Sequence, residues 1–435
     1  MFDRPNIGER ALLIHIKFQN PRLSADLREF KELAISAGAQ VIDTVISKRD
    51  ITDPKFLIGS GKVQEIADLV KEHAIELVLF NHDLSPSQER NLEKAISCRV
   101  LDRSGLILDI FSQRAKTFEG KLQVELAQLE HLSSRLIRGW THLERQKGGI
   151  GLRGPGETQL EEDRRNIKHK IYNIRKRLEK VHNQRNLNRQ SRTKAQIATV
   201  ALVGYTNSGK STLFKALTDD HSVFVADQLF ATLDLTLRVV PLPKIGKAIF
   251  ADTVGFISDL PHELIDAFQA TLEETVAADL LLHVIDCSDE IWREKKVQVE
   301  KVLHQIGALD VPMLEVYNKI DLVENMLPGS EVDYQNIPAR VKISAAKKIG
   351  LDFLKEAIAE RLCHDITRGQ LILAPTLAKA RAQLYEFGAV EGETIDQSGS
   401  FVLDINLQKE RWDKICATFP GLEKLFNTRV VAESE

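Results

Sequence analysis

The chain has 435 residues, of which 43% are hydrophobic and 28% are charged, and its formal net charge is −3. This length exceeds what one hydrophobic core supports, so we expect several domains. The hydrophobic content excludes an intrinsically disordered chain. Four well-separated cysteines without a C-x-x-C pair exclude a disulfide framework and a zinc site, and we expect reduced thiols in a cytoplasmic protein. The polar N-terminus and the lack of a long apolar run predict neither a signal peptide nor a membrane span.

Residues 1–115 alternate short apolar runs with amphipathic ones, which predicts a small α/β domain with a largely parallel sheet. The expected strands are residues 11–18, 41–45, 55–58, 77–80 and 99–101. Helical spacing covers residues 27–37 and 85–95, and Ser85 or Ser87 would cap the second helix, with Pro86 near its first turn. The sequence GSGK at residues 59–62 would follow a strand and open a helix, either as a second phosphate site or as a tight turn.

Residues 116–196 carry two apolar patterns of helical spacing on either side of a glycine-rich stretch. The first pattern comprises Leu122, Leu126, Leu129, Leu132 and Leu136, and the second, with the coiled-coil period, comprises Ile167, Ile171, Ile174, Leu178 and Val181. The stretch between them, GGIGLRGPG at residues 148–156, suits neither a helix nor a strand. We therefore predict an antiparallel helical hairpin with a glycine-rich tip loop.

The second arm of this hairpin is strongly basic. Residues 161–195 contain twelve Lys or Arg against four Asp or Glu. Such a patch attracts phosphate backbones, although a solvated helix face is the simpler alternative. Further basic and aromatic residues cluster near the tip, namely Arg138, Trp140, Arg145, Lys147 and Arg153. Because a loop of small residues, arginine and an aromatic suits insertion among RNA bases, we favour RNA binding.

The third unit opens with the pattern G-x-x-x-x-G-K-S at residues 204–211, between an apolar run and a helix-like segment. Glycines at both ends let several backbone N–H groups point inward, and the following helix adds its dipole. Lys210 would reach the β- and γ-phosphates, and the Ser211 hydroxyl would bind Mg²⁺. The predicted phosphate-binding loop comprises Gly204, Tyr205, Thr206, Asn207, Ser208, Gly209, Lys210 and Ser211, followed by Thr212.

Two further motifs each follow a predicted strand. In D-x-x-G, formed by Asp252, Thr253, Val254 and Gly255, the aspartate would hold Mg²⁺ through water and the glycine N–H would meet the γ-phosphate. In N-K-x-D, formed by Asn318, Lys319, Ile320 and Asp321, the Asp321 carboxylate would accept hydrogen bonds from guanine. Adenine would leave that carboxylate unpaired. Ser344, Ala345 and Ala346 follow a later strand, where their backbone can contact guanine O6. These motifs predict GTP as the nucleotide.

The motifs GYTNSGKS, FATLD, DTVGF, NKID and SAA together resemble the Obg–HflX branch of translation-associated P-loop GTPases. PKFLIGSGKVQEI, RSGLILDIFSQRAKTFEGKLQVELAQL and GGIGLRGPGETQLEEDRR are similar to the HflX family within that branch, and the resemblance covers about residues 1–365. It implies that FATLD contacts the nucleotide through Phe230, Ala231, Thr232, Leu233 and Asp234. Thr232 would bind Mg²⁺ in the GTP state, although the sequence alone would also allow Thr236.

The resemblance also implies partners. The N-terminal domains would bind the large (50S) ribosomal subunit and its rRNA, with the hairpin loop toward the peptidyl-transferase centre, and GTP would drive splitting or rescue of stalled ribosomes. We expect a monomer that does not bind DNA. Lys210, Thr232 and Gly255 would carry catalysis, with Ser211 and Thr232 on the metal. Phe256 stands where many small GTPases place a water-orienting Gln, so intrinsic hydrolysis should be slow.

The expected architecture is therefore α/β and multidomain. It comprises an α/β domain at residues 1–115, the hairpin at 116–196, a doubly wound GTPase domain at 197–364 and a small α+β domain at 365–435. In the last domain, Phe401, Leu403, Ile405 and Leu407 alternate as in a half-buried strand. Two alternatives remain: a GTPase that regulates a protein partner through the hairpin, and an ATP-driven RNA remodeller that uses residues 59–62.

Overall fold

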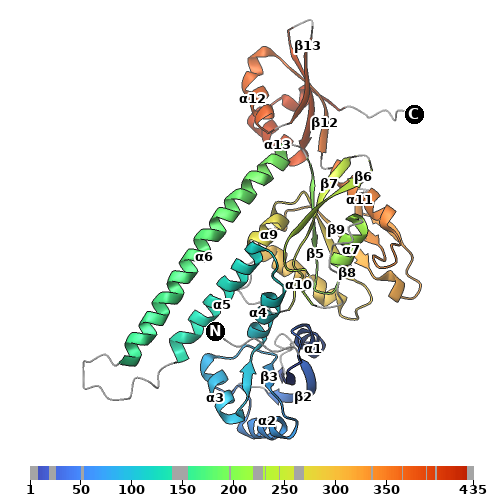
Figure 1. Ribbon diagram of the computed structural model, residues 1–435. Coiled ribbons are helices and arrows are strands. Elements are labelled where there is room, and N and C mark those ends of the chain that lie inside the picture. The colour runs from blue at the N-terminus through green and yellow to red at the C-terminus, as the bar shows by residue number, and fades with distance from the viewer. Residues whose placement is uncertain are drawn as a thin grey trace.

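The computed structural model contains three sheets and a long helical hairpin (Figure 1). It describes residues 8–18, 26–49, 53–139, 155–194, 197–218, 229–230, 232–243, 245–258, 269–334, 337–364, 366–387, 389–396 and 399–428. None of the helices in these ranges has the length and apolar character needed to cross a membrane. Each sheet lies within one of the predicted domains, whose boundaries remain predictions.

The first sheet is parallel throughout, as predicted, with strand order β2-β1-β3-β4. Its strands are β1 (Arg10–Phe18), β2 (Gln40–Arg49), β3 (Leu77–Phe80) and β4 (Arg99–Leu101), and its helices are α1 (Leu27–Ser36), α2 (Ser60–Glu72), α3 (Pro86–Ile96) and α4 (Arg103–Arg114). Ser85 caps α3 by accepting from the Gln88 N–H, and the Gln88 side chain returns a hydrogen bond to Ser85.

The predicted strand at residues 55–58 is wrong. The Asp53 carboxylate accepts from the N–H groups of Lys55 and Phe56, at 2.7 and 3.0 Å, which folds this segment into a turn. Leu57 has a φ of 63°, a conformation that a continuous strand does not contain. The apolar residues here are buried beneath the turn and not in a sheet ladder.

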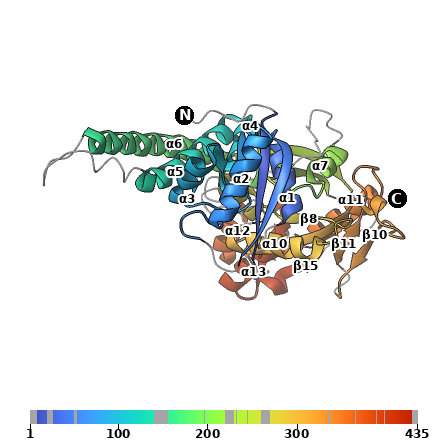
Figure 2. The same ribbon diagram turned by 90° about the horizontal axis from the view of Figure 1, so that it is seen from below.

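The helical hairpin is confirmed. Its arms are α5 (Phe118–Gly139) and α6 (Pro155–Lys194), and it extends beyond the rest of the molecule in both views (Figures 1 and 2). The seam between the arms comprises Leu122, Leu126 and Ile174, with Leu129, Ile171 and Leu178 packed against them. The tip at residues 140–154, which holds most of the predicted basic and aromatic cluster, lies outside the described residues.

The central sheet has strand order β10-β11-β9-β8-β5-β7-β6. Its strands are β5 (Thr199–Val203), β6 (Thr236–Leu242), β7 (Gly246–Asp252), β8 (Leu280–Asp286), β9 (Met313–Asn318), β10 (Gly329–Val332) and β11 (Pro338–Lys342). The five inner strands are parallel and the two edge strands antiparallel. The surrounding helices are α7 (Lys210–Thr218), α9 (Gln269–Val276), α10 (Trp292–Gln305) and α11 (Leu351–His364), and a short 3₁₀ helix, η3, spans Ile320–Leu322.

All five residues of β5 are buried, since this strand lies between β7 and β8 with helices on both faces. In such a sheet, ligands bind at the carboxyl ends of the strands. The segments that carry the sequence motifs follow β5, β7, β9 and β11, so the topology brings them to one edge. This confirms the α/β fold class.

The last sheet is antiparallel with order β13-β14-β12-β15. It comprises β12 (Ile366–Leu373), β13 (Val390–Ile395), β14 (Phe401–Gln408) and β15 (Phe426–Thr428), with α12 (Ala378–Glu386), α13 (Lys409–Thr418) and the short 3₁₀ helices η4 (Pro375–Leu377) and η5 (Leu422–Leu425). The predicted alternation is confirmed, because Leu403, Ile405 and Leu407 are buried in the core of this unit.

Candidate functional site

The loop between β5 and α7 has a backbone that requires glycine at two positions. Gly204 and Gly209 have φ values of 152° and 92°. A Cβ at Gly204 would lie 2.3 Å from the Val284 carbonyl oxygen, and one at Gly209 would lie 2.2 Å from Asn318 Nδ2. Because neither position has room for a side chain, the two glycines let the loop approach Val284 of β8 and Asn318 at the end of β9 closely while it turns into α7.

Lys210 begins α7 and folds back over this loop. Its Nζ donates to the carbonyl oxygens of Gly204 and Tyr205, at 3.0 and 2.8 Å, and the residue is only 6% exposed. Burial lowers the pKa of Lys210 to about 8, and the nearby Asp252 carboxylate opposes that shift. The Lys210 ammonium group is therefore a desolvated positive charge that lies against the anion-binding loop.

Three oxygen-bearing side chains meet beside Lys210. The hydroxyls of Ser211 and Thr232 lie 2.6 Å apart, and Thr232 Oγ1 donates to Asp252 Oδ2 at 2.9 Å. Asp252 Oδ1 is buried without a hydrogen-bond partner among the described residues. Burial raises the pKa of Asp252, while Lys210 and the two hydroxyls lower it. The sequence allowed either Thr232 or Thr236 as the threonine that binds the metal. The threonine in this cluster is Thr232, whereas Thr236 belongs to strand β6.

This cluster has the donor set of a magnesium site that is shared with a phosphate ligand. Hard oxygen donors suit Mg²⁺, which usually takes one or two protein ligands together with substrate phosphates. The described residues contain no group of three or more His, Cys, Asp or Glu that could hold a metal by itself. The unpartnered Asp252 oxygen supplies a further acceptor on the same side.

The N-K-x-D residues connect two loops at the end of β9. Asn318 Nδ2 donates to the Ser208 carbonyl oxygen, and Asn318 Oδ1 accepts from the Ala345 N–H, both at 2.9 Å. Asp321 Oδ1 accepts from Ser344 Oγ at 2.6 Å, and this hydrogen bond is the main reason that the pKa of Asp321 is lowered. The carboxylate is therefore ionised and available as an acceptor. Ile320 is buried beneath this loop.

Lys319 occupies the left-handed region with a φ of 67°, and its Nζ lies 2.7 Å from Asp286 Oδ2 at the end of β8. This ion pair holds the Lys319 side chain extended along the loop that would lie beside a guanine base. The Ser344 and Ala345 residues are buried, and Ala346 is exposed at the start of the following turn.

The D-x-x-G segment folds directly onto the phosphate loop. A Cβ at Gly255 would lie 2.8 Å from Thr206 Cγ2 and 3.0 Å from Lys210 Nζ. Phe256 accepts from the Thr206 N–H at 2.7 Å and donates to the Gly204 carbonyl at 3.1 Å, while its side chain is buried in the core. Thr253 Oγ1 donates to the Leu202 carbonyl, so it anchors the segment to β5, and Val254 packs against the core.

Three predicted nucleotide contacts have their side chains directed elsewhere. Tyr205 Oη bonds to Glu29 and to Ser258, and the Phe230 ring lies edge-on to Phe111 with centroids 4.6 Å apart. The Asp234 carboxylate accepts from the start of α5, as described below. We therefore assign these three side chains to packing between parts of the chain. Leu233 is buried, and Ala231 lies outside the described residues.

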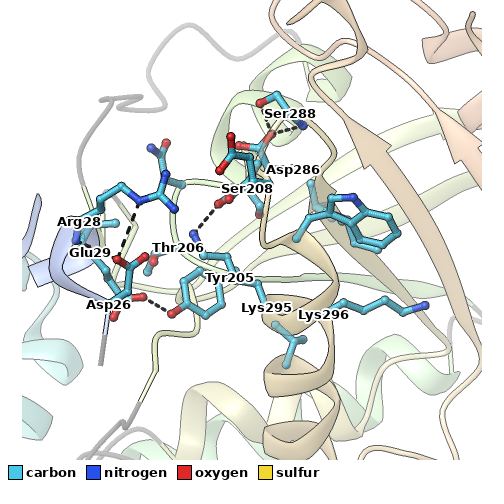
Figure 3. Close-up of a pocket in the computed structure, with 18 of the residues that line it drawn as sticks. Asp26, Arg28, Glu29, Tyr205, Thr206, Ser208, Asp286, Ser288, Lys295 and Lys296 are labelled. Carbon is cyan, nitrogen blue, oxygen red and sulfur yellow. Dashed lines mark hydrogen bonds and ion pairs between the residues drawn. The ribbon is translucent and has the colours of Figure 1, made fainter. Parts of the chain in front are cut away.

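Sequence reasoning missed a buried polar network that joins α1 and α4 to the phosphate loop. Glu29 accepts from Arg103. It also accepts from Tyr205 Oη, as Figure 3 shows. Arg103 also donates to the Ser258 carbonyl at 3.1 Å and to Asn81 Oδ1 at 2.8 Å. A pocket of about 370 Å³ borders this network, between α1, the outer face of the phosphate loop and α10. The network residues lie far apart in the sequence, and no motif marks them.

The GSGK segment begins α2 without a preceding strand. Gly59 is the N-cap with an ordinary φ of −72°, and Lys62 Nζ lies 2.7 Å from Glu65 Oε1. The lysine is thus directed along its own helix. This arrangement favours the tight-turn interpretation of the two glycines.

Comparisons with known proteins match almost the whole chain. Family models described as "GTP-binding GTPase N-terminal", "GTP-binding GTPase Middle Region" and "50S ribosome-binding GTPase" match residues 24–112, 114–192 and 199–319. A relative named GTPase HflX from Escherichia coli (strain K12) is 51% identical, covering 97% of this chain and 99% of the relative. GTPase HflX from Caldanaerobacter subterraneus subsp. tengcongensis is 46% identical, covering 90% and 89%. A solved GTP-binding protein from Sulfolobus solfataricus in complex with GDP is 25% identical, with a TM-score of 0.43, covering 82% of this chain and 99% of that one.

Proposed function

The chain belongs to the HflX family of GTPases, and from this premise we propose that its GTP cycle acts on the large ribosomal subunit in the cytoplasm, where it splits or rescues stalled ribosomes. The observation that carries the proposal is that the GTPase sequence motifs meet at one edge of the central sheet in a molecule that also has an exposed basic hairpin arm. The matched model of a 50S ribosome-binding GTPase supports the choice of partner.

The residues at the edge of the central sheet divide the work of binding GTP. Lys210 would neutralise the β- and γ-phosphates, and the Gly255 N–H would donate to the γ-phosphate. Ser211 and Thr232 would hold Mg²⁺, which supplies charge neutralisation on the transferred phosphoryl group when it is bound. Asp321 would accept from the guanine ring, with Asn318 joining the base loop to the phosphate loop.

Hydrolysis by the isolated protein should be slow. Phe256 is buried and apolar, so its side chain cannot orient a water molecule by hydrogen bonding. We infer that the bound ribosomal subunit orders the catalytic geometry. GTP hydrolysis would then be fast only on the ribosome.

The basic arm offers a surface for rRNA. Among the Lys and Arg of α6 whose side chains the structure describes, the exposed ones are Arg164, Arg165, Lys168, Lys170, Arg175, Lys176, Arg177 and Lys180. Tyr172 is 63% exposed in the middle of this row, where its ring can stack on an unpaired base. Arg185 and Arg189 are half-buried instead and form ion pairs with Glu119 and Glu274. The exposed basic side chains that the structure describes therefore lie on the part of the arm nearer the tip.

Cosedimentation with large subunits tests this proposal. The protein would be mixed with subunits in the GTP-analogue, GDP and nucleotide-free states at two salt concentrations, and whole ribosomes would be monitored for subunit separation. We expect binding that is strongest with the analogue and falls steeply with log salt. Reversing two arm charges, Lys176→Glu with Lys180→Glu, should weaken binding. Reversing two exposed charges elsewhere, Lys247→Glu with Lys301→Glu, is the matched control.

Equal subunit binding by both double variants at both salt concentrations would remove the arm from the recognition surface. Salt-insensitive binding that follows a protein component would instead favour the alternative of a GTPase that regulates a protein partner. Binding without any separation of whole ribosomes would limit the function to association.

A further inference from the structure

We propose that Asp234 is a positioning residue, which holds Thr232 in place by anchoring its segment to Lys116 and Thr117, the two residues that lead into the hairpin arm α5. The inference rests on the proposed function for its ribosomal readout, but part of its test needs no ribosome. It assigns to the hairpin a second task besides docking, namely to set how well the protein distinguishes GTP from GDP.

The anchor consists of three contacts at the start of α5. The Asp234 carboxylate accepts from the N–H groups of Lys116 and Thr117, at 2.8 and 2.9 Å, and from Thr117 Oγ1 at 2.5 Å. Lys116 and Thr117 immediately precede the first helical residue, Phe118, so the carboxylate lies next to the positive end of the helix dipole, which favours a negative charge. Hydrogen bonds to a charged acceptor are also stronger than neutral ones.

The same helix keeps its own cap without Asp234. Thr117 Oγ1 accepts from the Gly120 N–H at 3.0 Å, so Thr117 caps the first turn of α5. Asp234 is therefore an additional partner from another part of the chain, 117 residues away from Thr117. Its loss should release the segment at residues 232–234 while α5 remains formed.

Gly120 gives the carboxylate room to approach. A Cβ at this position would lie 2.1 Å from Asp234 Oδ1. Elsewhere in a helix interior, alanine is favoured over glycine by roughly 1 kcal/mol. The Gly120→Ala variant should thus strengthen the helix and expel Asp234, so it separates helix stability from the anchor.

Thr232 lies two residues before the anchor and its hydroxyl belongs to the predicted metal cluster. Two residues span at most about 7 Å, so a shift of α5 relative to the central sheet is transmitted to the Thr232 hydroxyl. This hydroxyl already touches Ser211 and Asp252. The position of the hairpin arm and the geometry around the γ-phosphate are therefore mechanically joined through one short segment.

A second connection joins the hairpin to the helix that follows the D-x-x-G segment. Glu273 and Glu274 of α9 pair with His182 and Arg189 of α6, at 3.0 and 3.5 Å. Glu119 of α5 pairs with Arg185 of α6 at 2.8 Å, which fixes the two arms to each other at this end. Helix α9 is thus attached to the same end of the hairpin as the segment that carries Thr232.

Coupling between two sites is reciprocal for binding free energies. If the anchor carries it, removing the anchor should reduce two ratios: the preference of the isolated protein for a GTP analogue over GDP, measured with Mg²⁺ present, and the preference of large subunits for the analogue-bound over the GDP-bound protein. The second ratio equals the factor by which bound subunits raise the first. We expect a reduction of about tenfold in Asp234→Ala and Gly120→Ala, a typical coupling strength. Asp234→Asn, which keeps one acceptor oxygen, should fall between these variants and the wild type.

The outcomes separate the possible failures. Unchanged ratios in folded Asp234→Ala and Gly120→Ala proteins would overturn the inference, as would a lowered thermal midpoint with intact discrimination, which is the signature of a merely structural contact. If wild-type protein does not bind subunits at all, the proposed function fails. The ratio of analogue to GDP affinity in the isolated variants then still decides the role of Asp234.

Discussion

Replacing Tyr205 with Phe removes one oxygen from the network between the phosphate loop and the N-terminal helices. Tyr205 Oη donates to Glu29 and accepts from the Ser258 N–H at 2.8 Å. The aromatic ring would remain, so its packing and its contact with Lys295, at 4.9 Å from the centroid, should persist. The variant therefore isolates the contribution of the hydroxyl.

The expected cost follows from the hydrogen bonds with Glu29 and with the Ser258 N–H, and the third contact, with Ser258 Oγ at 2.6 Å, adds to it. The bond to a charged carboxylate contributes about 1.5–3 kcal/mol, and the bond from the backbone N–H about 0.5–1.5 kcal/mol. Tyr205 and Glu29 are 6% and 4% exposed, so water cannot readily replace either partner. We expect local opening between α1 and the phosphate loop to become easier by about 2–4 kcal/mol.

Hydrogen exchange measures this quantity better than global unfolding, because a chain of several domains does not unfold in two states. Amides of α1 and of residues 256–258 should exchange at least about 30-fold faster in Tyr205→Phe, since 1.4 kcal/mol corresponds to a factor of ten. Tyr385→Phe is a matched control, because Tyr385 also donates to a glutamate, Glu393, but is 45% exposed. Equal exchange in wild type and Tyr205→Phe would refute the idea that the hydroxyl holds the two parts together.

Three further predictions concern the candidate site and the buried histidines. The pKa of Lys210 is about 8 in the free protein, so phosphate binding above pH 8 must take up a proton. The GTP affinity of the wild type should therefore fall as the pH rises above 8. Lys210→Ala should bind GTP weakly at every pH. A pH-independent wild-type affinity, from titrations at pH 7 to 10, would contradict this. Asp321→Asn should shift the preference from GTP toward XTP in competition binding, and an unchanged preference for GTP would refute the assigned base contact. Burial lowers the pKa values of His15 and His283 to about 4 from 6.5, so between pH 4 and 6.5 the unfolded chain binds more protons than the folded one. The stability of the folded protein should therefore fall as the pH drops from 6.5 toward 4. An equal thermal midpoint at pH 7 and pH 5 would argue against this prediction.

Much of the fold could be predicted from the sequence, because periodic patterns record local structure. The heptad spacing of Leu122, Leu126 and Ile174 identified the hairpin seam, and the alternation around Leu403 identified a strand. The motif residues of the nucleotide site were equally accessible, since each motif follows its own strand and parallel strands end at one edge.

Contacts between distant segments could not be predicted in this way. Glu29 looks like any acid on an amphipathic helix, yet it meets Arg103, 74 residues later, and Tyr205, 176 residues later. Asp234 lies in a motif that was predicted to contact the nucleotide, but its carboxylate binds the N–H groups of Lys116 and Thr117, just before α5. The apolar run at residues 55–58 suggested a strand because its periodicity does not reveal that Asp53 forms a turn with it.

The length of α6 gives small movements at its inner end a large effect at the other. The helix has 40 residues, which corresponds to about 60 Å at a rise of 1.5 Å per residue. About 45 Å of it lies between Arg185, where it is ion-paired to α5, and Pro155 beside the tip. A tilt of about 5° at Arg185 would displace Pro155 by about 4 Å over that length. If the proposed coupling holds, the hairpin would act as a lever with a short inner arm, and a small rearrangement around a phosphate would become a displacement of about the 3.4 Å spacing of stacked bases.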